Sequence, residues 1–188
     1  MKITVPADLT HNVEEVENFL VKHTGTKFDE SNKCWVVLSD EAFFHKVVYE
    51  DTEFIIMVVG GPNTRKDYHV DEGEEFFYQL KGKMVLRIIQ NNKPKDIQIN
   101  EGEIFLLPSK IPHSPQRFEN SVGLVIERKR TKDELDGFQW YCDHCDNLLY
   151  EKFFTLRDIV KDLPIVFDTF WSNKEYRTCS ECGEILDK

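Results

Sequence analysis

Short apolar runs separated by turn-forming residues are the feature that most limits how this chain can fold. Between residues 34 and 128, runs rich in Val, Ile and Phe alternate with Gly, Pro, Asn or Asp. In KMVLRIIQ, for example, Met84, Leu86 and Ile88 occupy alternate positions, as one buried face of a strand requires. The predicted strands are residues 34–38, 43–49, 53–59, 74–80, 83–90, 96–99, 103–108 and 122–128. Many short strands at even spacing predict an all-β sandwich or barrel rather than alternating strands and helices.

Helical patterns flank the predicted strands. Apolar residues recur at helical spacing over 11–22, and two helical pieces, 155–163 and 164–171, meet at Pro164, which we expect to break the helix. A charged stretch, ERKRTKDELDG, follows the last predicted strand. We therefore expect a catalytic domain over 1–130, with a helical lead-in at 1–33, and a C-terminal metal-binding segment over 131–188.

The overall charge and the apolar runs argue against several classes of protein. A formal charge of -10 disfavours nucleic acid and anionic membrane surfaces as partners. The most apolar run, FIIMVVGG, is far shorter than the roughly 20 residues that cross a bilayer. The N-terminus, MKITVPADLT, lacks the apolar core of a signal peptide. We expect a cytoplasmic protein that acts on a small molecule.

Four of the five cysteines form two CxxC pairs, CDHC at 142–145 and CSEC at 179–182. This pattern predicts a four-thiolate metal site, formed by Cys142, Cys145, Cys179 and Cys182, in a reducing compartment. The 33 residues between the pairs exceed the usual zinc-ribbon spacing, and the spacing leaves zinc and iron open. A saturated tetrahedral site has no open position, which favours a structural role over electron transfer.

Two histidines stand at spacings that resemble the metal-binding motifs of the cupin superfamily of jelly-roll barrels. Gly61, Asp67, His69, Glu75 and Gly82 are similar to the first cupin motif, with Asp67 in place of a histidine. The motif spacing selects Glu75 rather than Glu74 as the ligand, and its even separation from His69 agrees.

The second motif is similar to residues 102–117, which contain His113 in a segment that three prolines would stiffen into a rigid loop. Lys110 replaces a glycine of the motif, and Arg117 replaces an asparagine. Two histidines and one carboxylate are the facial arrangement typical of non-haem Fe(II) oxygenases, with positions open for substrate and O₂.

Three further charges accompany these ligands. Arg117 lies four residues after His113, and Glu127 ends the apolar run VGLVI, where an inward charge would be costly unless used. Arginine is suited to bidentate binding of a carboxylate. Together with Arg65, these residues predict a site for a small acid that carries a second polar group.

The stretches GGPNTRKDYHVDEGEEFFYQLKGKM, INEGEIFLLPSKIPHSPQR and GLVIER resemble the 3-hydroxyanthranilate dioxygenase family, and the cysteine pairs extend the resemblance. It implies catalytic Fe(II) on His69, Glu75 and His113. It also implies that Arg117 binds the substrate carboxylate, that Glu127 bonds its amino or hydroxyl group and that Arg65 lies near O₂. A rubredoxin-like iron in the cysteine site and a homodimer are implied as well.

The reaction that the resemblance implies opens the ring of 3-hydroxyanthranilate between carbons 3 and 4. Both oxygen atoms of O₂ enter the product, 2-amino-3-carboxymuconate semialdehyde, a precursor of quinolinate and hence of NAD. Two other functions remain open at this point. One is a cupin iron dioxygenase for a thiol or catechol-like substrate, and the other is a non-catalytic cupin that senses or stores a ligand.

Overall fold

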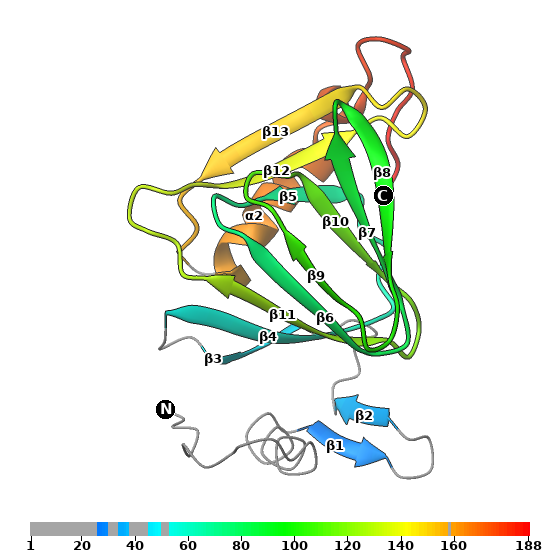
Figure 1. Cartoon of the computed structure of the whole chain (residues 1–188). Coiled ribbons are helices and arrows are strands. Elements are labelled where there is room, and N and C mark those ends of the chain that lie inside the picture. The colour runs from blue at the N-terminus through cyan, green and yellow to red at the C-terminus, as the bar shows by residue number, and fades with distance from the viewer. Residues whose placement is uncertain (1–25, 30–33, 38–44, 50–52, 158) are drawn as a thin grey trace.

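A computed structural model describes residues 26–29, 34–37, 45–49, 53–157 and 159–188. Two antiparallel sheets face each other and form the expected all-β jelly-roll barrel (Figure 1). The helix predicted over 11–22 lies outside the described residues. Within the predicted helical lead-in, residues 26–29 instead form strand β1 (Thr26–Asp29), which pairs with β2 (Cys34–Val37).

The two barrel sheets have six and five strands. The six-stranded sheet has the order β13 (Leu148–Phe154), β12 (Asp136–Tyr141), β5 (Asp67–Val70), β10 (His113–Arg117), β7 (Met84–Gln90) and β8 (Lys93–Ile99). The five-stranded sheet has the order β3 (His45–Tyr49), β4 (Phe54–Gly60), β11 (Val122–Arg128), β6 (Glu75–Lys81) and β9 (Ile104–Leu107).

Apolar residues from both sheets fill one end of the barrel. Their inward positions alternate along each strand with outward ones, as in β7, where Met84, Leu86 and Ile88 are buried. The core cluster consists of Met57, Val59, Phe77, Met84, Leu86, Ile88, Ile99, Leu107 and Val125. This cluster borders the polar interior, since its members Ile88 and Leu107 are the register partners of His113 and Glu75.

All eight predicted strands are present, but four strands of the six-stranded sheet were not predicted: β5, β10, β12 and β13. Strands β5 and β10 read DYHV and HSPQR, with too few apolar residues to show a strand pattern. The prediction that His113 lies in a proline-stiffened loop is wrong, because His113 is the first residue of β10. Pro115 lies within that strand.

One continuous helix, α2 (Ile159–Ser172), runs through Pro164, so the predicted break at this residue is wrong. Pro164 lies near the start of α2, where its missing N–H removes only one hydrogen bond close to the first turn. A short helix, α3 (Lys174–Arg177), follows. Helix α2 packs on β12 through an aromatic cluster in which Trp140 stacks on Phe170 with ring centroids 4.3 Å apart.

Strands β12 and β13 join the C-terminal segment to the barrel. Strand β12 pairs directly with β5, so that Phe138 lies beside His69 and Trp140 beside Asp67. The domain division near residue 131 stays a prediction, and the sheet is continuous across it (Figure 1). None of the described helices has the length and apolarity that a membrane crossing needs.

Candidate active site

Three potential metal ligands converge from the two sheets. His69 on β5 and His113 on β10 are register partners in the six-stranded sheet, while Glu75 begins β6 in the opposite sheet. One ligand atom from each of the three lies within 4.8 Å of the others. Glu75 is buried, whereas Glu74 is exposed. The choice of Glu75 over Glu74 therefore agrees with the side that each carboxylate faces.

Hydrogen bonds orient both imidazole rings. His113 Nδ1 donates to the carbonyl oxygen of Ile111 at 3.0 Å, which leaves Nε2 facing Glu75 Oε2 at 2.7 Å. A proton on Nε2, or a metal ion bound by both atoms, satisfies a contact of this length. His69 Nε2 donates to Asp136 Oδ1 at 2.9 Å, the carboxylate–histidine pairing typical of metal ligands.

Acidic and basic side chains are concentrated at the site. Among the described residues in and behind the cavity wall, five carboxylates lie close to three guanidinium groups. The carboxylates are Asp67, Asp71, Glu75, Glu127 and Asp136, and the arginines are Arg65, Arg117 and Arg130. Burial acts to raise the pKa of Glu75, but His113 and His69 outweigh it and lower the pKa to about 2. An ionised, buried Glu75 is suited to bind a metal cation.

A cavity of about 510 Å³ opens beside the three ligands, a volume suited to a small aromatic molecule. The predicted residues Arg65, His69, Glu75, His113 and Glu127 all line it. Its apolar wall comes from both sheets and from the C-terminal segment, and consists of Met57, Pro62, Pro115, Phe138, Leu156, Leu163 and Phe167. Leu163 and Phe167 belong to α2, so this helix closes one side of the cavity.

Arg117 lies behind this lining, on β10, and its side chain is buried. Its Nε and Nη1 have no hydrogen-bond partner among the described residues. Burial lowers the pKa of Arg117 to about 10, which leaves it cationic at neutral pH. A Cβ added to Gly123 would lie 2.5 Å from Nη1, so the glycine leaves room for the guanidinium group. Arg117 is thus a buried cation whose Nε and Nη1 are available to donate hydrogen bonds to a ligand.

Arg65 and Glu127 each have a partner that the sequence did not suggest. Arg65 forms an ion pair with Asp67, the residue that replaces the histidine of the cupin motif. Glu127 Oε2 lies 3.0 Å from Arg130 Nη2, and burial raises the pKa of Glu127. Arg130 and Asp136 were missed because both lie in or beside a charged stretch that reads as solvated surface. The one sequence feature that could have indicated their burial is the apolar run VGLVI, which ends shortly before Arg130.

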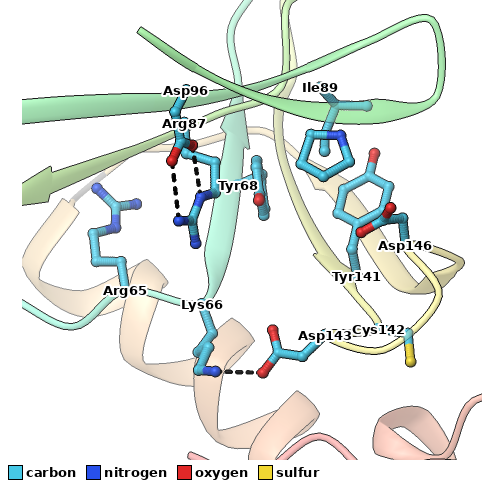
Figure 2. A pocket seen from close by; sticks show the side chains of 11 residues that line it. Arg65, Lys66, Tyr68, Arg87, Ile89, Asp96, Tyr141, Cys142, Asp143 and Asp146 are labelled. Atoms are coloured by element: carbon cyan, nitrogen blue, oxygen red, sulfur yellow. Dashed lines mark hydrogen bonds and ion pairs between the residues drawn. The ribbon is translucent and has the colours of Figure 1, made fainter. Parts of the chain in front are cut away.

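A second hollow, of about 310 Å³, lies against the outer side of β5 (Figure 2). Tyr68 lines it, while its neighbours Asp67 and His69 line the main cavity. Four of its charged groups form two ion pairs: Arg87 binds Asp96 at 2.9 Å, and Lys66 pairs with Asp143 (Figure 2). The Lys66–Asp143 pair ties the first cysteine loop to the segment that carries Arg65.

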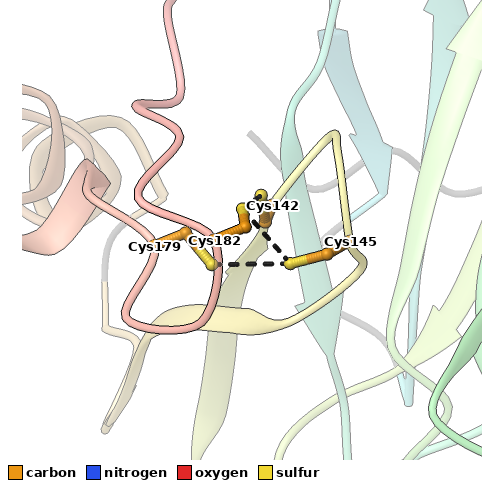
Figure 3. A group of neighbouring side chains, drawn as sticks. All are labelled: Cys142, Cys145, Cys179 and Cys182. Atoms are coloured by element: carbon orange, nitrogen blue, oxygen red, sulfur yellow. Dashed lines mark hydrogen bonds between the residues drawn. The ribbon is translucent and has the colours of Figure 1, made fainter.

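The four predicted cysteines meet between two loops (Figure 3). Their sulfur atoms are 3.5 to 3.6 Å apart in the contacts between Cys142 and Cys182, Cys145 and Cys179, and Cys145 and Cys182. A tetrahedral ion with bonds of about 2.3 Å separates its sulfurs by about 3.8 Å. The residues after the last cysteine of each pair, Asp146 and Gly183, both have positive φ, at 61° and 77°. The geometry fits a tetrahedral metal.

The fold and the site define a cupin with a candidate mononuclear metal centre. A family model described as 3-hydroxyanthranilic acid dioxygenase matches residues 35–171, and the chain belongs to this family.

Relatives named 3-hydroxyanthranilate 3,4-dioxygenase occur in Xanthomonas euvesicatoria, 55% identical over 75% of this chain and 80% of that one, and in Jannaschia sp., 52% identical over 75% and 79%. A solved cupin-2 domain protein from Shewanella frigidimarina has a TM-score of 0.42 at 17% identity, covering 49% of this chain and 86% of that one.

Proposed function

We propose that this chain opens the ring of 3-hydroxyanthranilate between carbons 3 and 4 with O₂, using Fe(II) held by His69, Glu75 and His113. The product is 2-amino-3-carboxymuconate semialdehyde, in the branch that leads to quinolinate and NAD. The names of the relatives support this reaction. The observation that carries it is the group of His69, Glu75 and His113 beside a cavity of about 510 Å³, together with the buried Arg117, whose Nε and Nη1 have no hydrogen-bond partner among the described residues.

Iron, when bound, would supply the electron transfer between substrate and O₂ that no side chain can perform. Arg117 would bind the substrate carboxylate through its unpaired donors, since a buried guanidinium binds an anion more strongly than a solvated one. This contact would fix the orientation of the ring in the cavity. A thiol substrate would leave the guanidinium unpaired, which favours an acid.

Glu127 would accept a hydrogen bond from the amino or hydroxyl group of the substrate. It lines the cavity and is buried, and its raised pKa suits it to take the hydroxyl proton. Arg65 would lie on the O₂ side, where a cation stabilises negative charge that develops on oxygen. The ion pair with Asp67 holds Arg65 in the cavity wall. The apolar wall, including Leu163 and Phe167 of α2, would exclude water.

The cysteine centre would hold iron or zinc in a structural role. All four positions of a tetrahedral ion are taken by Cys142, Cys145, Cys179 and Cys182, and ring cleavage by a dioxygenase needs no outside electrons. The four thiols meet as a metal-binding group rather than as disulfides, which supports a cytoplasmic location.

We also propose a homodimer. Strand β9 lies at an edge of the five-stranded sheet and exposes 65% of Ile104 and 53% of Leu106. An apolar edge of this kind is usually covered by a partner. Light scattering after size-exclusion chromatography tests this, with Leu106→Glu expected to give a monomer. A monomeric wild type would refute the dimer without affecting the catalytic proposal.

One experiment tests the catalytic function. The apo-protein is loaded with Fe(II) without oxygen, 3-hydroxyanthranilate is added, and O₂ is then admitted while substrate loss and semialdehyde formation are followed. Glu75→Gln should abolish turnover and reduce iron binding, while Glu74→Gln, a matched change on the exposed neighbour, should leave both unchanged. A fully iron-loaded wild type that forms no ring-opened product would overturn the proposal and favour a non-catalytic cupin.

A further inference from the structure

Arg130 has more carboxylate contacts than any other arginine of the described site. Its Nη2 lies 2.8 Å from Asp136 Oδ1, 3.0 Å from Glu127 Oε2 and 3.3 Å from Asp71 Oδ2. Its Nε also donates to Asp136, at 3.1 Å. The Arg130 side chain is only 12% exposed. A guanidinium group with its long side chain ordered in this way is no ordinary solvated surface charge.

Two of these carboxylates, Asp136 and Glu127, contact the proposed active site directly. Asp136, which is fully buried, accepts a hydrogen bond from His69 Nε2 at 2.9 Å. Glu127 lines the cavity, and Arg130 takes one of its two carboxylate oxygens. Arg130 therefore connects a proposed metal ligand to a proposed substrate contact. The two belong to different sheets, since His69 lies on β5 and Glu127 on β11.

The contact between Arg130 and Asp71 shows why a cation is needed between these carboxylates. Asp71 is buried and accepts a hydrogen bond from the backbone N–H of Gly73 at 2.8 Å, which holds the turn before Glu75. Without Arg130, three buried carboxylates would lie close together with little to offset their repulsion. Each would then move apart or take up a proton, and both His69 and Glu127 would lose their fixed partners.

We propose that Arg130 is a positioning residue for ring cleavage: its guanidinium group fixes Asp136 behind His69 and fixes Glu127 toward the substrate at the same time. Arg130 lines the cavity, and its Nη1 has no hydrogen-bond partner among the described residues. We assign its effect to the carboxylates bound by Nη2 and Nε rather than to Nη1. This inference rests on the proposed roles of His69 and Glu127. In addition, the affinity for the metal and the affinity for the substrate both depend on Arg130, which is not itself a metal ligand.

Two binding titrations test the proposal, and neither measures turnover. Co(II) is the metal probe and is titrated into protein whose cysteine site is already loaded, while 3-hydroxyanthranilate is titrated into the Co(II) form without oxygen. Arg130→Met removes the cation, and Arg130→Lys keeps it but cannot bridge the carboxylates. Arg128→Met is the matched control, because Arg128 ends β11, two residues before Arg130, and pairs with Glu134 at 39% exposure.

Arg130→Met should raise both dissociation constants by about 10- to 100-fold, the usual cost of losing a partner behind a metal ligand. Arg130→Lys should raise both by a smaller factor, and Arg128→Met should change neither. If Arg130→Met does not fold, Arg130→Lys carries the test, together with Glu127→Gln. Adding Arg130→Lys to Glu127→Gln should cost no further substrate affinity, while Co(II) affinity should still fall.

Unchanged dissociation constants, within twofold, in folded Arg130→Lys or Arg130→Met would overturn the proposal. Loss of only thermal stability, to the extent seen in Arg128→Met, would do the same. These results differ from failure of the proposed function, in which the wild type itself would bind neither Co(II) at the His69, Glu75 and His113 site nor 3-hydroxyanthranilate.

Discussion

Arg117 and Gly123 depend on each other across two sheets. Arg117 lies on β10, and Gly123 lies on β11 in the opposite sheet, where the absence of a side chain leaves room for the guanidinium group. A charged side chain buried without protein partners costs several kcal/mol, as an order of magnitude. A protein keeps such a residue where a ligand completes its hydrogen bonds. Arg117→Ala and Gly123→Ala test whether this ligand is the substrate.

Arg117→Ala should weaken substrate binding by about 10- to 150-fold, the loss expected for a charge-assisted contact worth roughly 1.5 to 3 kcal/mol. Metal content should stay normal, because Arg117 is not one of the three proposed ligands and its Nε and Nη1 have no hydrogen-bond partner among the described residues. Anaerobic titration with substrate and elemental analysis measure the two effects. Arg87→Ala, on the neighbouring strand β7, is the control. Loss of metal in Arg117→Ala would make the residue structural.

Gly123→Ala should raise KM for the substrate about tenfold while the metal stays bound, since a displaced donor loses on the order of 1.4 kcal/mol. The added Cβ would lie 2.5 Å from Arg117 Nη1 and 3.1 Å from Gln79 Oε1, which forces the guanidinium to move. Steady-state kinetics with metal analysis check this.

Gly102→Ala is an instructive control, because the φ of 82° at Gly102 makes alanine strained there although no atom lies within 4 Å of the added Cβ. It should lose stability but keep KM. A normal KM in Gly123→Ala would contradict the account.

At the level of elements, the sequence predicted the strands that build the apolar core, including β6 and β11 with Glu75 and Glu127, but missed β5 and β10. Strand β7 alternates apolar residues because one face is buried in the core. Strands β5 and β10 place His69, His113 and Arg117 inside the barrel, so polar side chains occupy their inward positions. Motif spacing selected the candidate ligands His69, Glu75 and His113, but no periodicity could show that the short polar segments β5 and β10 are strands.

The same contrast explains the residues that were missed. Arg130 and Asp136 gain their importance only from register, since β12 pairs with β5 and brings Phe138 beside His69. Arg130 lies between Lys129 and Thr131, and Asp136 follows the acidic residues Asp133 and Glu134, so the sequence around them gives no sign of burial. Helix α2 was recognised as helical, but its continuity through Pro164 depends on packing against β12, which a local pattern does not contain.

Pro164→Ala should stabilise the protein by about 1 to 3 kcal/mol. Alanine restores an N–H that can bond the carbonyl group of Val160, and Pro164 is exposed, so no core contact is lost. Thermal or urea unfolding measures the change. Ile165→Ala, at the adjacent position with 66% exposure, should be nearly neutral and serves as control. A lower stability in Pro164→Ala would mean that the proline instead fixes the start of α2.

For the whole molecule, β12 connects the proposed catalytic metal site with the four-cysteine group. It begins with Asp136, which bonds His69, continues through Phe138 and Trp140 under α2, and ends just before Cys142. The Lys66–Asp143 ion pair adds a second link from the first cysteine loop to the segment before β5. The cysteine centre thus anchors one end of the strand whose other end lies behind the catalytic site.

Cys142→Ser should reduce the free energy of unfolding by several kcal/mol, in line with the contribution of a structural tetrahedral metal to folding. Cys142 is buried at the end of β12, and its loss would leave three thiolates and a loosened strand end. Turnover per catalytic iron should stay close to that of the wild type below the unfolding transition, because Asp136 and Phe138 remain held by β5 and α2.

Three measurements separate a structural role of the cysteine site from a role in electron transfer. They are thermal unfolding, metal analysis and oxygen-dependent turnover per iron, each with and without added reductant. Ser180→Ala, in the second loop but outside the four thiols, controls for changes to the loop itself. A Cys142→Ser protein as stable as the wild type, which loses activity during turnover and regains it only with reductant, would assign electron transfer to this centre. A less stable protein with normal turnover assigns it a structural role, and the anchored end of β12 is the physical reason.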